Sequence, residues 1–112
     1  MFGFDEAMAK GRSAFSREDF EVAAMYFSHA ANIIRNSAAA EYMYGVCCAL
    51  LKAHDQAQHA FYRAIGSASQ WWERFVIRET MRFFALMNHD YELADALAAL
   101  NGTNKQAAIP VA

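Results

Sequence analysis

The sequence predicts an all-α protein built from antiparallel helical hairpins, and two observations lead to this prediction. Glycine occurs five times and proline once in 112 residues, which disfavours a β fold with many tight turns. Small and aromatic residues also recur at an offset of 34 positions, which indicates internal repeats. We expect about six helices, near 4–16, 19–35, 38–52, 55–66, 70–88 and 90–100.

Local signals mark some ends of these helices. Ser37 and Ser69 belong to the residue types that cap helix N-termini, because a serine hydroxyl accepts a backbone N–H. Asn101-Gly102 predicts the end of the last helix. We therefore expect one domain over residues 1–103 and a mobile tail over residues 104–112.

The offset of 34 relates two equivalent segments. Each segment holds a glycine, an alanine, an aromatic residue and a second alanine at the same spacing. The two sets are Gly11, Ala23, Phe27, Ala30 and Gly45, Ala57, Phe61, Ala64. Small residues at the crossing of two helices let the backbones approach closely, and the aromatic residue fills the gap to the next pair.

This glycine, alanine, aromatic, alanine skeleton resembles the tetratricopeptide repeat. The segments Glu18-Asp19-Phe20-Glu21 and His89-Asp90-Tyr91-Glu92 are similar to the family's turn into the second helix, and His54-Asp55-Gln56 is a weaker version. The resemblance implies repeats near 4–37 and 38–71, stacked as a right-handed superhelix of hairpins.

The third unit, over residues 72–101, is degenerate. Ala57 and Ala94 are 37 positions apart, and Ala98 and Asn101 replace the aromatic residue and the second alanine. A degenerate unit is expected where a stack of repeats ends.

Two other family positions are not kept. Arg35 and Ser69 stand where the family has a proline near each repeat end, and Ala7 and Glu41 stand where it has a first-helix tryptophan. The roles of that proline and that tryptophan therefore do not carry over to this chain.

The resemblance also implies a ligand site, because the first helix of each repeat lines the concave side of the stack. The carried-over positions are Asp5, Met8, Arg12 and Phe15, then Ala39, Tyr42, Val46 and Ala49, with Met43 beside them. Some family members bind a C-terminal carboxylate with lysine and asparagine, but Met8, Arg12 and Met43 occupy the matching places here. We therefore expect a groove for an apolar helix or extended peptide.

The alternative is that these methionine and aromatic side chains form ordinary core. The groove hypothesis requires Tyr42 and Phe15 to be exposed anchors. The core hypothesis requires them to be buried.

The first helix of the third hairpin is unusually apolar. Its large side chains spread over about half of a helical wheel, and they are Trp72, Phe75, Val76, Phe83, Phe84, Leu86 and Met87. Such a helix is packed on two sides, or packed on one side and bound on the other. Arg74, Arg78 and Arg82 form either a basic strip for an acidic partner or nucleic acid, or a solvated face. Glu79 either pairs with an arginine such as Arg82 or faces a groove.

Catalytic and metal-binding patterns are absent from the sequence. The adjacent Cys47 and Cys48 point about 100° apart on a helix, so we expect two buried free thiols and neither a disulfide nor a chelating pair. None of the four histidines has the spacing of a known metal motif. We expect no enzyme activity, no cofactor and no metal.

Composition narrows the class of partner. Only 20% of the residues are charged, whereas 56% are hydrophobic, so we expect a partner to cover some apolar surface. The net charge of −2 disfavours nucleic acid, no apolar run is long enough to span a membrane, and the acidic start is unlike a secretory signal, so we expect a cytoplasmic protein.

These observations predict a protein-protein interaction module or chaperone. The chain is similar in size and groove character to the small tetratricopeptide-like chaperones of bacterial type III secretion. The alternative is a structural scaffold subunit that forms a homodimer or larger homo-oligomer through its third hairpin.

Overall fold

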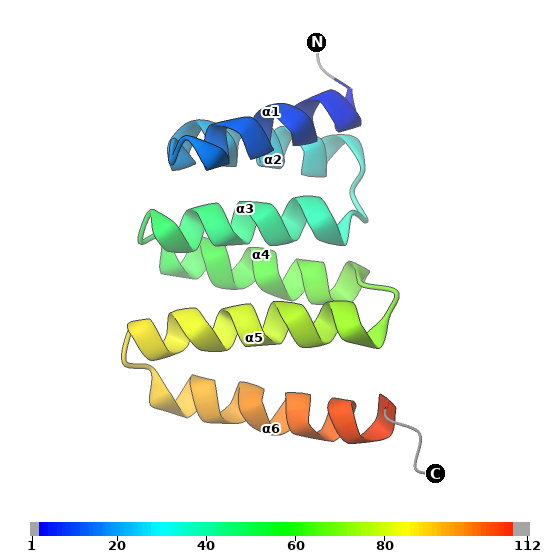
Figure 1. Cartoon of the computed structure of the whole chain (residues 1–112), viewed down its shortest axis with the longest axis vertical. Coiled ribbons are helices and arrows are strands. Elements are labelled where there is room, and N and C mark those ends of the chain that lie inside the picture. Colours follow the sequence, from blue (N-terminus) through cyan, green and yellow to red (C-terminus); the bar gives the residue numbers. More distant parts are fainter. Residues whose placement is uncertain (1–2, 109–112) are drawn as a thin grey trace. The chain divides into compact units, whose positions relative to one another are not determined.

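The structure, a computed structural model, describes residues 3–108 and the side chains of residues 3–102. Within this range the chain forms six α-helices and no strand, which confirms the predicted all-α class (Figure 1). The helices are α1 Phe4–Ser16, α2 Phe20–Ile33, α3 Ala38–Leu50, α4 His54–Ser67, α5 Trp71–Met87 and α6 Tyr91–Ala108. The first five lie within a few residues of the predicted ranges.

The helices belong to two compact units. The first unit ends at Ser67 and contains α1 to α4, and the second begins at Ala68 and contains α5 and α6. In the first unit α1 packs against α2, α2 against α3 and α3 against α4, whereas in the second α5 packs against α6. The division lies a few residues before the boundary predicted between the second and third repeats.

The turns inside the three hairpins share one backbone conformation. In each turn one non-glycine residue adopts a left-handed conformation: Glu18 has φ 61°, Lys52 has φ 67° and His89 has φ 60°. These residues are 34 and 37 positions apart, which are the offsets of the sequence pattern. The next residue then donates its N–H to the carbonyl five residues earlier, as in a Schellman motif. These bonds are Asp19 to Ala14, Ala53 to Cys48 and Asp90 to Ala85.

Side chains cap several of the helices. Ser37 accepts the N–H of Ala40 at 3.2 Å, so its predicted capping role is confirmed. The prediction for Ser69 is wrong, because α5 begins after Gln70. The hydroxyl of Ser69 instead donates to the Glu73 carboxylate at 3.2 Å, and the same carboxylate oxygen accepts the N–H of Gln70 at 2.9 Å.

The core of the first unit is built on paired glycine and phenylalanine residues. A Cβ placed on Gly11 would lie 2.7 Å from the ring of Phe27, and one placed on Gly45 would lie 2.8 Å from the ring of Phe61. Both rings are almost fully buried, and so are the four alanines of the pattern. Each repeated glycine is therefore a place where the repeated phenylalanine of the same hairpin packs against the helix backbone.

The predicted helix end at Asn101-Gly102 is wrong, because α6 continues through both residues to Ala108. Asn101 is 3% exposed, and its amide donates to the Phe75 carbonyl at 3.1 Å and to the Glu79 carboxylate at 3.0 Å. An asparagine ends a helix when its side chain bonds locally to the backbone, but this one bonds to the neighbouring helix α5. Residues 104–108 of the predicted tail are therefore helical, and residues 109–112 lie outside the described part of the chain.

Candidate functional site

The predicted ligand-facing residues of α1 differ widely in exposure. Met8 is 5% exposed and belongs to the core of the first unit. Arg12 is exposed, and Asp5 is exposed one turn before Met8. Phe15 is half-buried, with its ring 5.2 Å from the ring of Phe20 in an edge-on arrangement.

The predicted residues of α3 are mostly half-buried. Ala49 is 6% exposed, whereas Tyr42, Met43 and Val46 retain part of their surface. The ring of Tyr42 lies 6.1 Å from the ring of Phe61 on α4. Met43 packs against the same core cluster as Phe15 of α1, so the fold brings these two predicted residues to one cluster.

Some of these residues fit the core hypothesis, and others fit the groove hypothesis only in part. Met8 and Ala49 are core residues and offer almost no surface to a partner. Tyr42 and Phe15 are neither fully exposed anchors nor fully buried core. The accessible part of the predicted set is Asp5, Arg12, Phe15, Ala39, Tyr42, Met43 and Val46.

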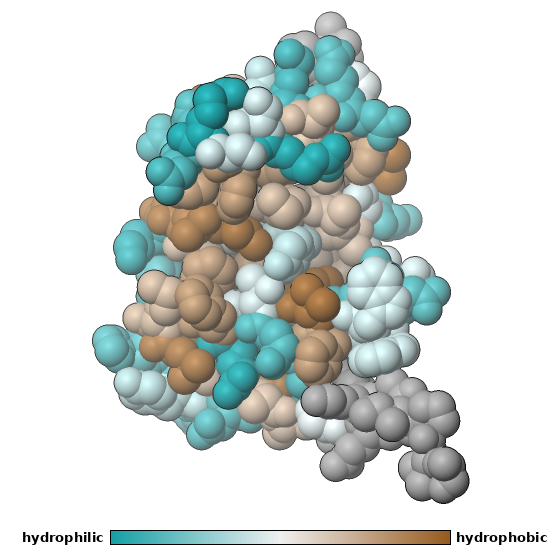
Figure 2. All heavy atoms as spheres, viewed as in Figure 1, coloured by the Kyte–Doolittle hydropathy of each residue, from teal (hydrophilic) through white to brown (hydrophobic). Residues whose placement is uncertain are grey.

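The second unit exposes more apolar surface than the predicted residues do. Trp72, Val76, Phe83 and Met87 are 54%, 45%, 56% and 58% exposed, and Leu86 beside them is 41% exposed. Steps of four, seven and four residues place the first four on one side of α5. We call these five residues the α5 apolar face. Figure 2 shows apolar side chains recurring along α5 on the side turned to the reader.

The sequence contained a signal for this face that the repeat register did not use. Adding the offset of 37 to the carried-over positions 39, 46 and 49 gives Val76, Phe83 and Leu86, whereas position 42 gives Glu79. The regular repeats end before α5, so their register does not include these residues. The sequence alone left open whether this apolar side of the helix was packed or exposed.

The three arginines of α5 are partly engaged within the second unit. Arg74 donates to the Ala68 carbonyl at 3.1 Å, and Arg82 lies 3.5 Å from the Glu79 carboxylate. Burial, with the nearby charge of Arg74, lowers the pKa of Arg78 below its ordinary value. The arginines therefore match neither a freely solvated face nor an unengaged basic strip. Glu79 pairs with both Arg82 and Asn101.

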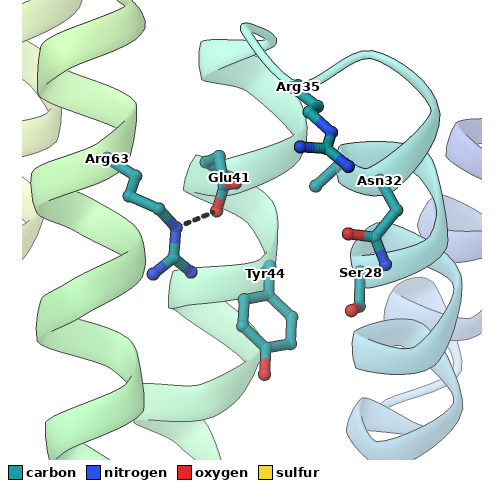
Figure 3. Close-up of a pocket in the computed structure, with 7 residues that line it drawn as sticks. Ser28, Asn32, Arg35, Glu41, Tyr44 and Arg63 are labelled. Carbon is teal, nitrogen blue, oxygen red and sulfur yellow. Dashed lines mark hydrogen bonds and ion pairs between the residues drawn. The ribbon is translucent and has the colours of Figure 1, made fainter.

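A polar pocket of about 410 Å³ lies in the first unit between α2, α3 and α4 (Figure 3). Glu41 is 8% exposed, and its carboxylate accepts a hydrogen bond from Nε of Arg63 at 3.1 Å. The pocket is lined by Ser28, Ala31, Asn32, Arg35, Glu41, Tyr44 and Arg63. We call this site the polar pocket.

The polar pocket lies at a departure from the resembled family. Glu41 stands where that family has a tryptophan, and the small residue Ala31 of α2 lines the same pocket. Glutamate fills much less volume than an indole, and it brings a charge that needs a partner when it is buried. The substitution was visible in the sequence, but the pocket depends on which helices pack around it.

The two cysteines are buried free thiols, as predicted. Burial raises the pKa of Cys47 to about 12, and burial also raises the pKa of Cys48. Thiolate is therefore scarce at neutral pH, which disfavours a nucleophilic role. Among the described residues, no cluster of three or more histidine, cysteine or acidic side chains is placed to hold a metal ion.

Comparison of the chain with protein-family models, with curated proteins and with solved structures finds no match. Over the part of the chain that the structure describes, no helix combines the length and the apolar character needed to cross a bilayer.

Proposed function

We propose that this protein is an interaction module that holds an apolar segment of another protein. The observation that carries the proposal is the α5 apolar face, whose five large side chains are each more than 40% exposed. Large exposed apolar side chains gathered on one side of a helix are typical of binding sites. Its aromatic and methionine side chains are also residue types that are enriched in interfaces.

The shape of this face fits a helical or extended segment. From Trp72 to Met87 the face runs for about 22 Å along α5, at 1.5 Å per residue. About four turns of an amphipathic helix cover that length and bury their own apolar side in doing so. Methionine and the aromatic side chains adapt to such a ligand without requiring a particular sequence.

We further propose that the protein belongs with the tetratricopeptide-type modules and works in the cytoplasm. The recurring glycine and phenylalanine contacts and the recurring turn conformation support this assignment. A role like that of the small type III secretion chaperones is one form of the proposal, since those proteins hold apolar segments before export. The half-buried residues Phe15, Tyr42, Met43 and Val46, with the exposed Arg12, would then be a separate candidate contact on the first unit.

A second candidate function follows from the same surface. Two copies of the chain pairing through the α5 apolar face would cover it equally well, as in a symmetric homodimer. The two functions differ in what the purified chain does alone. A structural subunit forms a defined homo-oligomer by itself. A module that holds a client forms a defined complex only when that client is present.

The test uses tagged full-length chain expressed in its native cells, with three versions compared. A Val76→Ser/Phe83→Ser double variant removes two exposed apolar side chains, and Met25→Ser removes one that is 64% exposed on α2 of the other unit. We expect one protein to co-purify in fixed stoichiometry with the wild type and with Met25→Ser, and to be lost from the double variant. Retention of that protein by the double variant would contradict the proposal. A defined homo-oligomer that the double variant dissociates would establish the second function instead.

A further inference from the structure

The polar pocket carries an excess of positive charge. Arg35 and Arg63 line it together with one acidic side chain, Glu41, so its ionisable side chains sum to one positive charge. Figure 3 shows Arg35 reaching in from the end of α2 and Arg63 from α4, on two sides of one space. A singly charged anion would neutralise this site.

The guanidinium of Arg63 has only part of its hydrogen-bonding capacity in use. Its Nε donates to Glu41, and Figure 3 shows both Nη atoms turned away from that carboxylate. A guanidinium has five N–H donors, and the edge formed by its two Nη groups matches the two oxygens of a carboxylate. Glu41 thus holds Arg63 in place and leaves this edge open.

Further donors line the same space without partners of their own. In the described part of the chain, the side chains of Arg35 and Asn32 form no hydrogen bond or ion pair. Asn32 and the hydroxyl-bearing Ser28 both project from α2, and the ring of Tyr44 forms a wall on α3. Two cations, an amide and a hydroxyl therefore surround a space of about 410 Å³, a size typical of small-ligand pockets.

We propose that the polar pocket binds a carboxylate group. A carboxylate is planar, carries one negative charge and fits the open edge of Arg63 with two parallel hydrogen bonds. A phosphate dianion fits less well, because its second charge would lie beside the buried carboxylate of Glu41. The group is supplied by an acidic side chain, by a chain end or by a small carboxylic acid.

This site is independent of the proposed apolar contact. Glu41 and Tyr44 project from α3 about 150° away from the side that carries Tyr42 and Val46, and the α5 apolar face belongs to the other unit. Carboxylate binding therefore succeeds or fails separately from the holding of an apolar segment.

The experiment follows the Nε–Hε signals of the arginines in the full-length, nitrogen-15-labelled chain by NMR. Four probes are titrated at matched ionic strength: N-acetylglutamic acid α-amide for a side chain, N-acetyl-dialanine for a chain end, propionate for a small acid, and inorganic phosphate. We expect saturable shifts of the Arg63 and Arg35 signals with at least one carboxylate probe, and weaker binding of phosphate. The carboxylate probe that binds most tightly identifies whether the group comes from a side chain, a chain end or a small acid.

Variants assign the effect to the pocket. Arg35→Gln removes an exposed cation and should weaken the tightest carboxylate about fivefold or more, the loss of roughly one charge-assisted hydrogen bond. Arg63→Lys keeps a positive charge beside Glu41 but removes the two-donor edge, so it should weaken binding as well. Arg17→Gln is the control, because it makes the same charge change on a residue whose side chain bonds to Ser13, outside the pocket.

Three outcomes overturn the proposal. The first is that the arginine signals shift linearly, without saturation, with every carboxylate probe. The second is that phosphate binds as tightly as the carboxylate probe that binds best. The third is that Arg17→Gln and Arg35→Gln weaken carboxylate binding equally. If Arg63→Lys does not fold, Arg35→Gln alone decides, because that side chain is exposed and forms no hydrogen bond or ion pair within the described part of the chain.

Discussion

The ring of Phe61 packs directly on the backbone of Gly45. A Cβ at Gly45 would lie 2.8 Å from both Cδ1 and Cε1 of the ring, which is closer than side-chain atoms pack. Phe61 is 1% exposed, so its ring has no solvent-filled space to move into. The missing side chain of Gly45 therefore sets how closely α3 approaches α4, and Gly11 does the same for α1 and α2.

We expect Gly45→Ala to lower the free energy of unfolding by about 1–2 kcal/mol. Forcing a methyl group into a filled core costs roughly 1–3 kcal/mol, and the better helix propensity of alanine returns up to about 1 kcal/mol. Urea denaturation followed by circular dichroism measures the change. Gly66→Ala is the matched control, because a Cβ at Gly66 on α4 meets nothing within 4 Å. That variant should be neutral or stabilised, and equal losses in both variants would refute the packing explanation.

The left-handed residue Lys52 provides a prediction of the opposite sign. A non-glycine residue with positive φ costs about 1 kcal/mol or more, which glycine avoids. Lys52→Gly should therefore raise the free energy of unfolding by about 0.5–1 kcal/mol, after allowing for the greater freedom of glycine in the unfolded chain. Lys52→Ala removes the same side chain but retains the strain, so it should give no such gain. A similar gain in both variants would mean that the lysine side chain itself is destabilising.

The buried amide of Asn101 joins α6 to α5 by donating to Glu79. Asn101→Asp keeps the shape of the side chain but places a second carboxylate at 3.0 Å from the first. We expect a loss of about 2–3 kcal/mol at neutral pH, because a buried donor is removed and like charges face each other. The loss should shrink on acidification to about pH 4, where the new carboxyl group becomes protonated and can donate again. Denaturation of wild type and variant at both pH values checks this, and a loss that does not change with pH would count against the contact.

The buried thiol of Cys47 should make stability fall at alkaline pH. Burial raises its pKa from 9.0 to about 12, so above about pH 9 the unfolded chain releases a proton that the folded chain keeps. Stability is therefore fully present below the unfolded pKa and declines as pH rises toward the folded one. Denaturation under reducing conditions from about pH 8 to about pH 10 should show this decline, and Cys47→Ala should show a shallower one. An identical pH dependence in the two proteins would argue that Cys47 does not titrate in this way.

From the sequence alone, the all-α class, five helix ranges to within a few residues, and the repeated glycine, alanine and phenylalanine positions could be predicted; the contact of each phenylalanine with the glycine of its own hairpin came from the fold. These features depend on residues three, four or seven positions apart, or on the single offset of 34. Such spacings can be counted directly in the sequence. The buried state of Cys47 and Cys48 followed for the same reason, since free cysteine on an alanine-rich helix belongs to the core. The cap at Ser37 is also local, because its hydroxyl bonds a backbone N–H three residues later.

Tertiary structure decided the features that depend on which helices meet. Asn101 and Gly102 read locally as a helix end, but the amide of Asn101 found its partners at Phe75 and Glu79 on α5, so the helix continued. Met8 shares a helix face with Arg12, yet packing buried the first and left the second exposed. The exposed fraction of a side chain depends on the residues that surround it in the folded protein. Position on the helix alone therefore did not separate Met8 from Arg12. The polar pocket likewise depends on three helices at once, with the charge of Glu41 visible in the sequence and its partner Arg63 brought to it only by the fold.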